Sequence, residues 1–373
     1  MQCSKYLIIY LNWFLNIKKS YLKHIKVKKI FYKFVALTLS LYNNFFFKKL
    51  TVIGKGKIPK DGAIIFSPNH QSALLDPLLV GVTNGKRVYS LTRSDVFRNP
   101  FLWVLDAMQT LPIYRIKDGY EKLHQNKETF EICYKLLKNK NNLMIFSEGK
   151  HHDKYFLLPI SKGSSKIGLE SLKKFSKTKV YLQAVGINYG NHIHPYHNCT
   201  IVYGNPIKLN KFIDPYKKKP AETINRVRLK LEDEMKKCLW LPNYSREYNI
   251  KKNLINYKST QHEFKILKKK ISQKDIKLKN NKSIRMVEKI AITFFSIFNL
   301  IPLILINSIL KKFSDRVFHL SIKYLTGLVI FPLWWTIVFF ISVYFLNIFL
   351  SLGIVILFVL FLFLRQFIII KNK

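Results

Sequence analysis

The stretch that most limits what this chain can fold into runs from residue 327 to residue 364, without a charged side chain before Arg365. Its only polar interruption lies around Asn347 and residues 351–353. Each half is close to the roughly 20 apolar residues that cross the hydrocarbon core of a bilayer. Basic residues flank the stretch at Lys323 and from residue 365 onward. The pattern predicts a transmembrane hairpin with both ends on the cytoplasmic side.

A second apolar segment, residues 290–310, is interrupted by Asn299, Pro302 and Asn307. If it crossed the bilayer, the basic loop that follows it would face away from the cytoplasm, against the preference for positive charge inside. We therefore expect a re-entrant or interfacial segment here.

The first fifty residues contain two apolar and aromatic runs, residues 6–15 and 34–47, with a Lys-rich stretch between them. A run of about ten residues is too short to cross a bilayer. We predict helices that lie on a membrane surface, with lysines toward the headgroups. Helices that dock onto the protein core are the alternative.

The middle of the chain alternates apolar strand patterns with helical ones, which predicts an α/β domain with a central, mostly buried sheet flanked by helices. The candidate strands are residues 63–67, 87–92, 110–115, 143–147, 180–188 and 200–203, and the candidate helices are residues 120–138, 162–175 and 221–240. We divide the chain into a surface segment (1–50), a catalytic domain (51–244), a basic solvated linker or amphipathic helix (245–289) and a membrane region (290–373).

The charge balance is strongly basic, with 63 Lys and Arg against 21 Asp and Glu and a net charge of +42. Such a balance favours an anionic partner, such as a lipid surface, a phosphorylated substrate or nucleic acid. However, Asn, Ile, Phe and Tyr are abundant too, as an AT-rich coding sequence would give. Charge alone therefore does not select the partner, and no recognised module supports nucleic-acid binding.

Cysteines and histidines offer little metal or thiol chemistry. Cys3, Cys133, Cys199 and Cys238 lie far apart in the sequence, which predicts neither a disulfide framework nor a zinc site. His192, His194 and His197 are close enough in sequence to ligate a metal, but no fourth ligand is evident. We expect a solvated loop there, and no metal.

The candidate catalytic pair is His70 and Asp76, just after the apolar run 63–67. The carboxyl end of a strand is where open α/β sheets place their chemistry. Histidine is a competent base near neutral pH, and a nearby carboxylate can fix its tautomer. A half-exposed histidine and a turn-capping aspartate remain the alternative for the pair taken alone.

Three further patches follow, each at or after a predicted strand. Residues 111–115 end in Arg115, whose guanidinium suits an anionic substrate. In residues 145–152, a Glu148-Gly149 turn could bring a carboxylate and backbone N–H groups close to a ligand. In residues 158–163, a lysine and a glycine open a helix, and a helix start is a natural phosphate site.

The order of these patches resembles the glycerolipid acyltransferases, which carry N-H-x-x-x-x-D, a strand ending in Arg, F-P-E-G-T-R, K-x-G or K-G, and V-P-V. The resemblance covers roughly residues 50–210, and the order of five motifs is more specific than any one of them. The matching residues here are Asn69, His70 and Asp76, then Arg115, then Phe146-Ser147-Glu148-Gly149, then Lys162-Gly163, then Ala184-Val185-Gly186.

The sequence departs from the family pattern in its spacing and in single residues. The separation of His70 and Asp76 is one residue longer, and on a continuous helix such positions lie about 120° apart. Because Pro77 follows, we expect Asp76 to be an N-cap and to meet His70 across a turn. The family's Pro, Thr, Arg and Pro are replaced by Ser147, Lys150, His151 and Ala184.

The resemblance implies a membrane-bound enzyme of phospholipid synthesis, with its catalytic domain on the cytoplasmic face. The acyl donor would be acyl-CoA or acyl carrier protein, with no other cofactor, and the acceptor a glycerophosphate or lysophospholipid. The catalytic residues would be His70 and Asp76, and substrate contacts would come from Asn69, Arg115, Glu148, Gly149, Lys150, His151, Lys162 and Gly163. A transacylase that takes its acyl chain from a phospholipid, and a non-catalytic protein that binds anionic lipid, are the alternatives.

Overall fold

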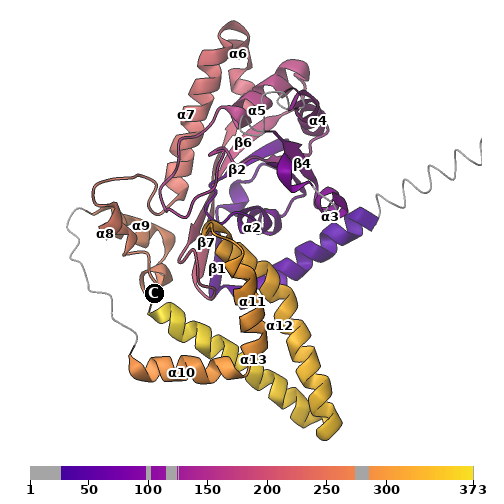
Figure 1. The fold of residues 1–373 in the computed structure, drawn as a ribbon. Coiled ribbons are helices and arrows are strands. Elements are labelled where there is room, and N and C mark those ends of the chain that lie inside the picture. Colours follow the sequence, from indigo (N-terminus) through magenta and orange to yellow (C-terminus); the bar gives the residue numbers. More distant parts are fainter. Residues whose placement is uncertain (1–26, 98–101, 115–123, 125, 274–284, 373) are drawn as a thin grey trace, which may run out of the picture.

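The computed structural model describes residues 27–97, 102–114, 124, 126–273 and 285–372. An α/β domain occupies one end, and a set of long apolar helices extends away from it (Figure 1). The predicted fold class is therefore confirmed.

The domain is built on one seven-stranded sheet with the order β1-β7-β6-β2-β5-β3-β4. Neighbouring strands are parallel except for β6 and β7. The strands are β1 (Lys49–Ile53), β2 (Ala63–Pro68), β3 (Val88–Arg93), β4 (Thr110–Ile113), β5 (Asn142–Met144), β6 (Val180–Tyr189) and β7 (Asn198–Lys208). All six predicted strands are present, and β1 was missed. Strand β5 ends earlier than the predicted strand 143–147, because the chain leaves the sheet after Met144 to form a turn.

Helices cover both faces of the sheet, as a buried parallel sheet requires. One face carries α4 (Asn126–Lys138), α5 (Gly163–Lys174), α6 (Ile213–Lys218), α7 (Pro220–Cys238), α8 (Tyr248–Lys252) and α9 (Phe264–Ser272). The other face is covered by α2 (Leu75–Thr83), by the helix of residues 27–46 and by the start of α12. A short α3 (Leu102–Ala107) precedes β4. The three predicted helices are confirmed as α4, α5 and α7; residues 120–123 and 125 of the first prediction lie outside the described residues.

Residues 248–272 are part of the globular core, so the prediction of a solvated linker is wrong for them. In α9, Phe264, Leu267 and Ile271 are buried at the spacing of one helix face, while lysines occupy the other. The alternative of an amphipathic helix holds for α9, but its apolar face packs on protein. The many lysines of this segment made its three spaced apolar residues difficult to recognise in the sequence. Residues 274–284 lie outside the described part of the chain.

The helix of residues 27–46 has two apolar faces, one buried against the protein and one exposed. On one face Leu39 and Phe46 are buried against the α/β domain, and Tyr324 Oη of α12 donates to Asn43 Oδ1 at 2.7 Å. On the other face large apolar side chains remain exposed: Ile30, Phe34, Leu37, Leu41 and Phe45. The apolar run at residues 6–15 lies outside the described residues.

The C-terminal hairpin consists of α12 (Val317–Phe345, 29 residues) and α13 (Ile348–Lys371, 24 residues). Both are long and apolar enough to cross a membrane. They turn where predicted, and Asn347 Oδ1 caps α13 by accepting from Leu350 N at 2.9 Å. Helix α12 is longer than the apolar stretch because its first turns, including Leu320 and Tyr324, are buried in the α/β domain.

The preceding apolar segment forms α10 (Met286–Ile297) and α11 (Leu300–Lys311), which bend by 100° at their junction. Asn299 at the bend is fully buried; its Nδ2 donates to Phe358 O at 2.8 Å and its Oδ1 accepts from Trp335 Nε1 at 3.0 Å. The turn after α11 lies against the α/β domain, since Asp315 contacts His151. This geometry fits the expected re-entrant or interfacial segment better than a straight span.

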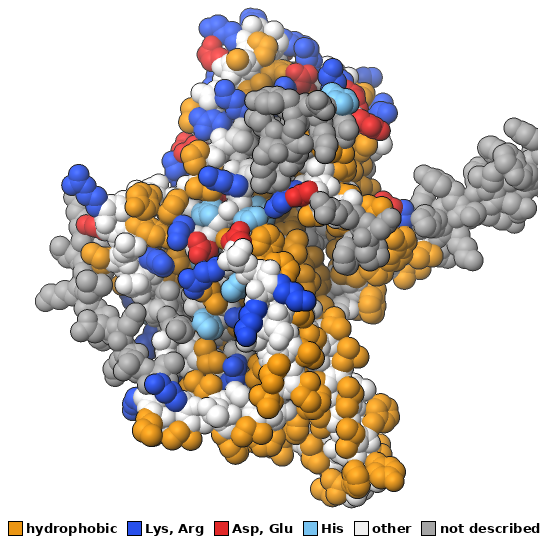
Figure 2. All heavy atoms as spheres, in the orientation of Figure 1, with side chains coloured by type: hydrophobic (Ala, Val, Ile, Leu, Met, Phe, Trp, Pro, Cys, Tyr) orange, Lys and Arg blue, Asp and Glu red, His pale blue; other side chains and the backbone are white. Residues whose placement is uncertain are grey.

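Figure 2 shows how side chains divide the surface: apolar atoms gather over the lower end, where α11 to α13 lie, whereas lysines and arginines are frequent over the α/β domain. Exposed apolar residues also cover α10 and α11, among them Ile290, Phe294, Ile297, Ile301 and Ile304. A surface this apolar is typical of contact with lipid.

Candidate active site

The site begins where β2 ends, in the middle of the sheet and at its carboxyl edge. Asn69 is fully buried; its Nδ2 donates to Ile187 O at 3.0 Å and its Oδ1 accepts from Ile187 N at 2.6 Å. The amide thus ties the loop after β2 to β6 and fixes where His70 leaves the sheet. Both ends of the amide are therefore used on Ile187, and the substrate contact of Asn69 stays a prediction.

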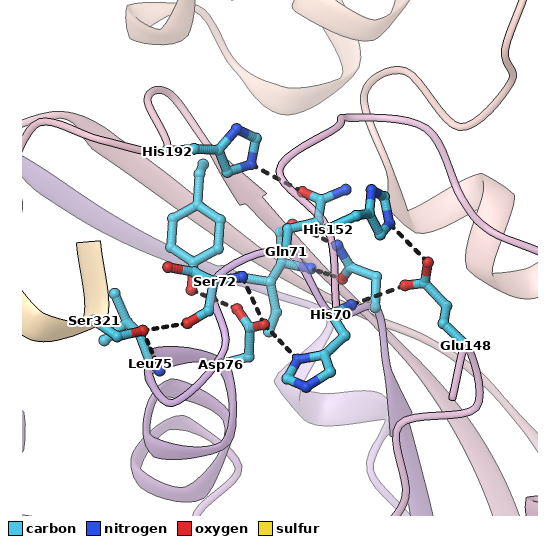
Figure 3. Close-up of polar contacts among 12 residues, drawn as sticks. His70, Gln71, Ser72, Leu75, Asp76, Glu148, His152, His192 and Ser321 are labelled. Atoms are coloured by element: carbon cyan, nitrogen blue, oxygen red, sulfur yellow. Dashed lines mark hydrogen bonds and ion pairs between the residues drawn. The ribbon is translucent and has the colours of Figure 1, made fainter. Parts of the chain in front are cut away.

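His70 and Asp76 meet, as Figure 3 shows, with Nδ1 and Oδ2 2.8 Å apart. Helix α2 begins at Leu75, so Asp76 lies in its first turn and the predicted N-cap role is wrong; the N-cap is Leu74. Pro77 is tolerated so early because the N–H groups of a first helical turn have no intrahelical partner. The contact still crosses the predicted turn, in which Ala73 has a φ of 41°.

Asp76 is held by two further donors, and its side chain is fully buried. Ser72 N donates to Oδ2 at 2.9 Å, and Tyr189 Oη lies 2.7 Å from Oδ1. Since a carboxylate only accepts, the hydrogen bond from His70 places the imidazole proton on Nδ1. In the neutral tautomer with its proton on Nδ1, Nε2 carries the lone pair that can take a proton from a substrate.

The imidazole of His70 contacts two neighbouring rings, and 18% of its side chain is exposed. Phe146 stacks on it with ring centroids 4.1 Å apart, and His151 approaches edge-on at 5.6 Å. His151 Nε2 lies 3.3 Å from Asp315 Oδ2. Burial and the nearby His70 outweigh this aspartate and lower the pKa of His151, which favours its neutral form.

Glu148 holds the backbone around the histidine. Its Oε1 accepts from His70 N at 2.8 Å; its Oε2 accepts from Leu158 N at 2.9 Å and lies 2.9 Å from His152 Nε2 (Figure 3). The side chain has no exposed surface. Glu148 therefore ties His70, Leu158 and His152 together, and its substrate contact stays a prediction.

The predicted Glu-Gly turn is present. Gly149 N donates to Phe146 O at 3.1 Å, and Gly149 has a φ of 71°, a region that favours glycine. Ser147, which stands where the family has Pro, joins three elements: its Oγ is 2.6 Å from Ser67 Oγ and 2.8 Å from Ser164 Oγ. The serine thus links β2, the turn and the first turn of α5.

The other predicted site residues lie around this centre. Lys162 directly precedes α5 and Gly163 begins it, as predicted, and both are exposed. Lys150 is exposed on the turn next to His151. Arg115 lies outside the described residues. The structure therefore brings His70, Asp76, Glu148 and His151 into direct contact or close approach.

Comparison with known proteins agrees with this arrangement. Residues 49–188, from the start of β1 into β6, match the family model described as Acyltransferase. Over 117 residues the chain is 29% identical to Glycerol-3-phosphate O-acyltransferase 2 of Saccharomyces cerevisiae. The match covers 31% of this chain and 16% of the yeast protein. The match to the Acyltransferase family model therefore lies within the α/β domain and includes His70, Asp76 and Glu148.

Among solved structures, the 1-acyl-sn-glycerophosphate (LPA) acyltransferase PlsC from Thermotoga maritima matches with a TM-score of 0.38 and 17% identity. The match covers 56% of this chain and 82% of that one.

Beside the acyltransferase centre, the three clustered histidines are not a solvated loop, and that expectation is wrong. His192 and His197 are buried; His192 Nε2 lies 3.3 Å from Gln71 Oε1, and His197 Nδ1 donates to His194 O at 2.7 Å. Burial lowers the pKa of His192 to about 3 and that of His197 to about 4. Among the residues the structure describes, no group of three His, Cys, Asp or Glu is placed to hold a metal.

Two residues of the acyltransferase centre were missed by sequence reasoning. Tyr189 ends β6 and supports Asp76, and Ser321 of α12 bridges the turn before α2. Each reaches the site through tertiary contacts across more than a hundred residues. The only signal in the sequence was the strand ending in Tyr189, next to the V-P-V-like block.

Proposed function

We propose that the protein is a membrane-bound O-acyltransferase that moves a fatty acyl group from an acyl thioester to a hydroxyl of glycerol-3-phosphate or lysophosphatidic acid. The observation that carries this proposal is the buried Asp76 carboxylate that holds Nδ1 of His70, on an imidazole that keeps 18% of its side chain exposed. The match of residues 49–188 to the Acyltransferase family model supports the reaction class.

In the proposed mechanism His70 Nε2 takes the proton of the acceptor hydroxyl as its oxygen attacks the thioester carbonyl. Asp76 stabilises the imidazolium that forms. Collapse of the tetrahedral intermediate breaks the carbon–sulfur bond, and the proton on His70 passes to the leaving thiolate. The ester and the free thiol are the products, and the histidine returns to its starting state.

No covalent acyl-enzyme is part of this proposal. Of the described cysteines, Cys133, Cys199 and Cys238 are buried, and burial raises the pKa of Cys133 and of Cys238 to about 12. Thiols held in this neutral form are poor nucleophiles.

For the acceptor we propose that Arg115, Lys150 and Lys162 attract the phosphate, together with the N–H groups at the start of α5, and that His151 contacts the acceptor as a neutral hydrogen-bonding group. The exposure of Lys150 and Lys162 supports this assignment. A helix N-terminus with adjacent lysine is suited to phosphate. Acyl-CoA or acyl carrier protein is the proposed donor, without a further cofactor.

We further propose that α12 and α13 cross the bilayer and that the acyltransferase domain lies on its cytoplasmic face. The start of α12 and the end of α13 both lie at the side of the domain (Figure 1). The basic residues at both ends favour the cytoplasmic side for them.

The test is the variant His70→Ala, with His262→Ala as control because His262 is exposed on the distant α9 side of the domain. Membranes holding each protein are offered glycerol-3-phosphate or lysophosphatidic acid with acyl-CoA or acyl carrier protein as donor. We expect His70→Ala to lower transfer by about 10² to 10⁴-fold, the usual contribution of a general base. Membrane flotation should not change in either variant.

Two results would contradict the proposal. Turnover by His70→Ala at the rate of the unchanged protein would exclude the mechanism. Transfer from a phospholipid without any thioester would instead identify a transacylase.

A further inference from the structure

A cavity of about 770 Å³ lies between the α/β domain and the C-terminal helices. Its walls come from the helix of residues 27–46, the loop 194–196 and helices α10 to α13. The lining is mostly aromatic and aliphatic, with Phe46, Phe331, Trp335 and Phe363 among its members. Neither His70 nor Asp76 contributes to it, so the cavity is separate from the acyltransferase centre.

Two basic side chains enter this apolar space, Lys323 from α12 and Arg365 from α13. Lys323 Nζ donates to Ile193 O at 2.9 Å, and Arg365 Nε donates to Ser296 Oγ at 2.8 Å. Within the described part of the chain, neither forms an ion pair with a carboxylate. Each keeps further N–H groups that can donate to a ligand.

Positive charges in apolar surroundings are costly unless an anion pairs with them. A lysine and an arginine in one cavity suit a phosphate, which accepts several charge-assisted hydrogen bonds at once. The walls add a second requirement. A free phosphate would leave the aromatic and aliphatic lining uncovered, whereas a phosphate that carries acyl chains would satisfy both parts of the cavity.

The position of the cavity indicates that such a ligand comes from the lipid bilayer. Two of its walls, α12 and α13, are the helices that are long and apolar enough to cross a bilayer. Its third wall, the helix of residues 27–46, carries an exposed apolar face. A lipid of the surrounding bilayer therefore reaches the cavity without leaving an apolar environment.

We propose that this cavity binds one anionic glycerophospholipid, with its phosphate on Lys323 and Arg365 and its acyl chains along the aromatic lining. The bound lipid joins α12 and α13 to the loop 194–196 of the α/β domain. The site rests on the proposed membrane location and does not depend on acyl transfer.

The experiment measures lipid retention by native mass spectrometry of the full chain purified from nanodiscs. The nanodiscs contain equal amounts of phosphatidylglycerol and phosphatidylcholine, because neither is the proposed acceptor. The test variant is the double substitution Lys323→Gln with Arg365→Gln. The control is Lys311→Gln with Lys312→Gln, which removes the same charge from exposed positions at the end of α11.

We expect the unchanged protein and the control to retain one phosphatidylglycerol in at least tenfold preference over phosphatidylcholine. The test variant should lose at least tenfold in phosphatidylglycerol occupancy. Exchanging the two cations (Lys323→Arg with Arg365→Lys) should preserve retention. Millimolar inorganic phosphate, the soluble source of the same chemistry, should not displace the lipid.

A second variant covers the case in which the test variant does not fold. Asn307 is exposed and lines the cavity, so Asn307→Trp fills space without removing a charge and should also lower occupancy. Equal occupancy in Asn307→Trp and the unchanged protein, equal retention of the two lipids, or displacement by phosphate alone would overturn the proposal. His70→Ala should retain the lipid whether or not it transfers acyl groups, which separates this site from the proposed reaction.

Discussion

At the scale of single residues, the site is a histidine whose orientation is fixed from three directions. Asp76 holds Nδ1, Phe146 stacks on the ring, and Glu148 accepts from the backbone N–H of His70. Nε2 is the ring nitrogen that these three contacts leave unused. Because the imidazole is already ordered, no further conformational entropy is lost when it acts as a base.

Tyr189 provides a test of the support beneath Asp76. Tyr189→Phe removes the hydroxyl that lies 2.7 Å from Asp76 Oδ1 but keeps the ring in place. The loss of one hydrogen bond to a charged group is worth about 1.5–3 kcal/mol, so we expect kcat to fall about 10 to 100-fold. KM should change little, because Tyr189 is fully buried and does not reach the substrate.

The kinetic constants distinguish this role from a purely structural one. Loss of the hydrogen bond to Asp76 should lower kcat of the folded enzyme with little change in KM, whereas general destabilisation would lower the amount of folded protein. As a matched control, Tyr203→Phe removes another buried hydroxyl, which contacts Thr83 instead of the site. A rate for Tyr189→Phe equal to that of Tyr203→Phe would contradict the prediction.

At the scale of elements, the apolar helix α12 is joined directly to the turn between His70 and Asp76, the proposed catalytic pair. Ser321 Oγ accepts from Leu75 N at 3.0 Å and also donates to Ser72 O. Phe318, one turn earlier, packs edge-on against His151 at 5.0 Å. The proposed membrane helix therefore helps to shape the turn between His70 and Asp76.

Ser321→Ala tests this connection. The substitution leaves Leu75 N and Ser72 O without their partner, and we expect a loss of about 1–3 kcal/mol, the cost of unpaired buried groups. Because the loss falls on the turn of the catalytic pair, acyl transfer should decrease by more than about 10-fold. The control is Thr326→Ala, whose hydroxyl bonds only within α12, to Ile322 O. Equal activities in radiolabel assays of the two variants would count against the coupling.

At the scale of the whole molecule, two buried histidines make stability depend on pH. Burial lowers the pKa of His192 to about 3 and that of His197 to about 4. In the unfolded chain both histidines titrate near pH 6.5. Below that pH the unfolded chain binds protons that the folded chain does not, so the free energy of unfolding decreases as the pH falls.

The expected size follows from the same linkage. From pH 7.5 to pH 5.0 each histidine should lower the free energy of unfolding by about 2 kcal/mol. Urea unfolding of the detergent-solubilised protein at several pH values measures this loss. His192→Gln should reduce the pH dependence, and His262→Ala, at an exposed position, should leave it unchanged. Equal stability at pH 5.0 and pH 7.5 would show that the two histidines are not buried as neutral groups.

Local patterns in the sequence were sufficient to predict much of the fold of this protein and part of its candidate site. The stretch without charged residues after residue 327 predicted the hairpin of α12 and α13. The length and apolar composition of a segment determine whether it can cross a bilayer. Alternating apolar runs predicted six of the strands. The motif order pointed to the acyltransferase family and to the pair His70 and Asp76, which the structure brings within hydrogen-bonding distance.

Tertiary structure alone decided what several of these residues do. Asn69 and Glu148 carry family motifs, yet their side chains are buried on backbone partners that no local pattern reveals. Tyr189 and Ser321 reach the site across separations of 113 and 249 residues. The basic segment around α9 packs on the core because three spaced apolar side chains outweigh its lysines. Periodicity and motifs are local properties of a chain, whereas hydrogen-bond partners and cavities are set by how distant elements pack.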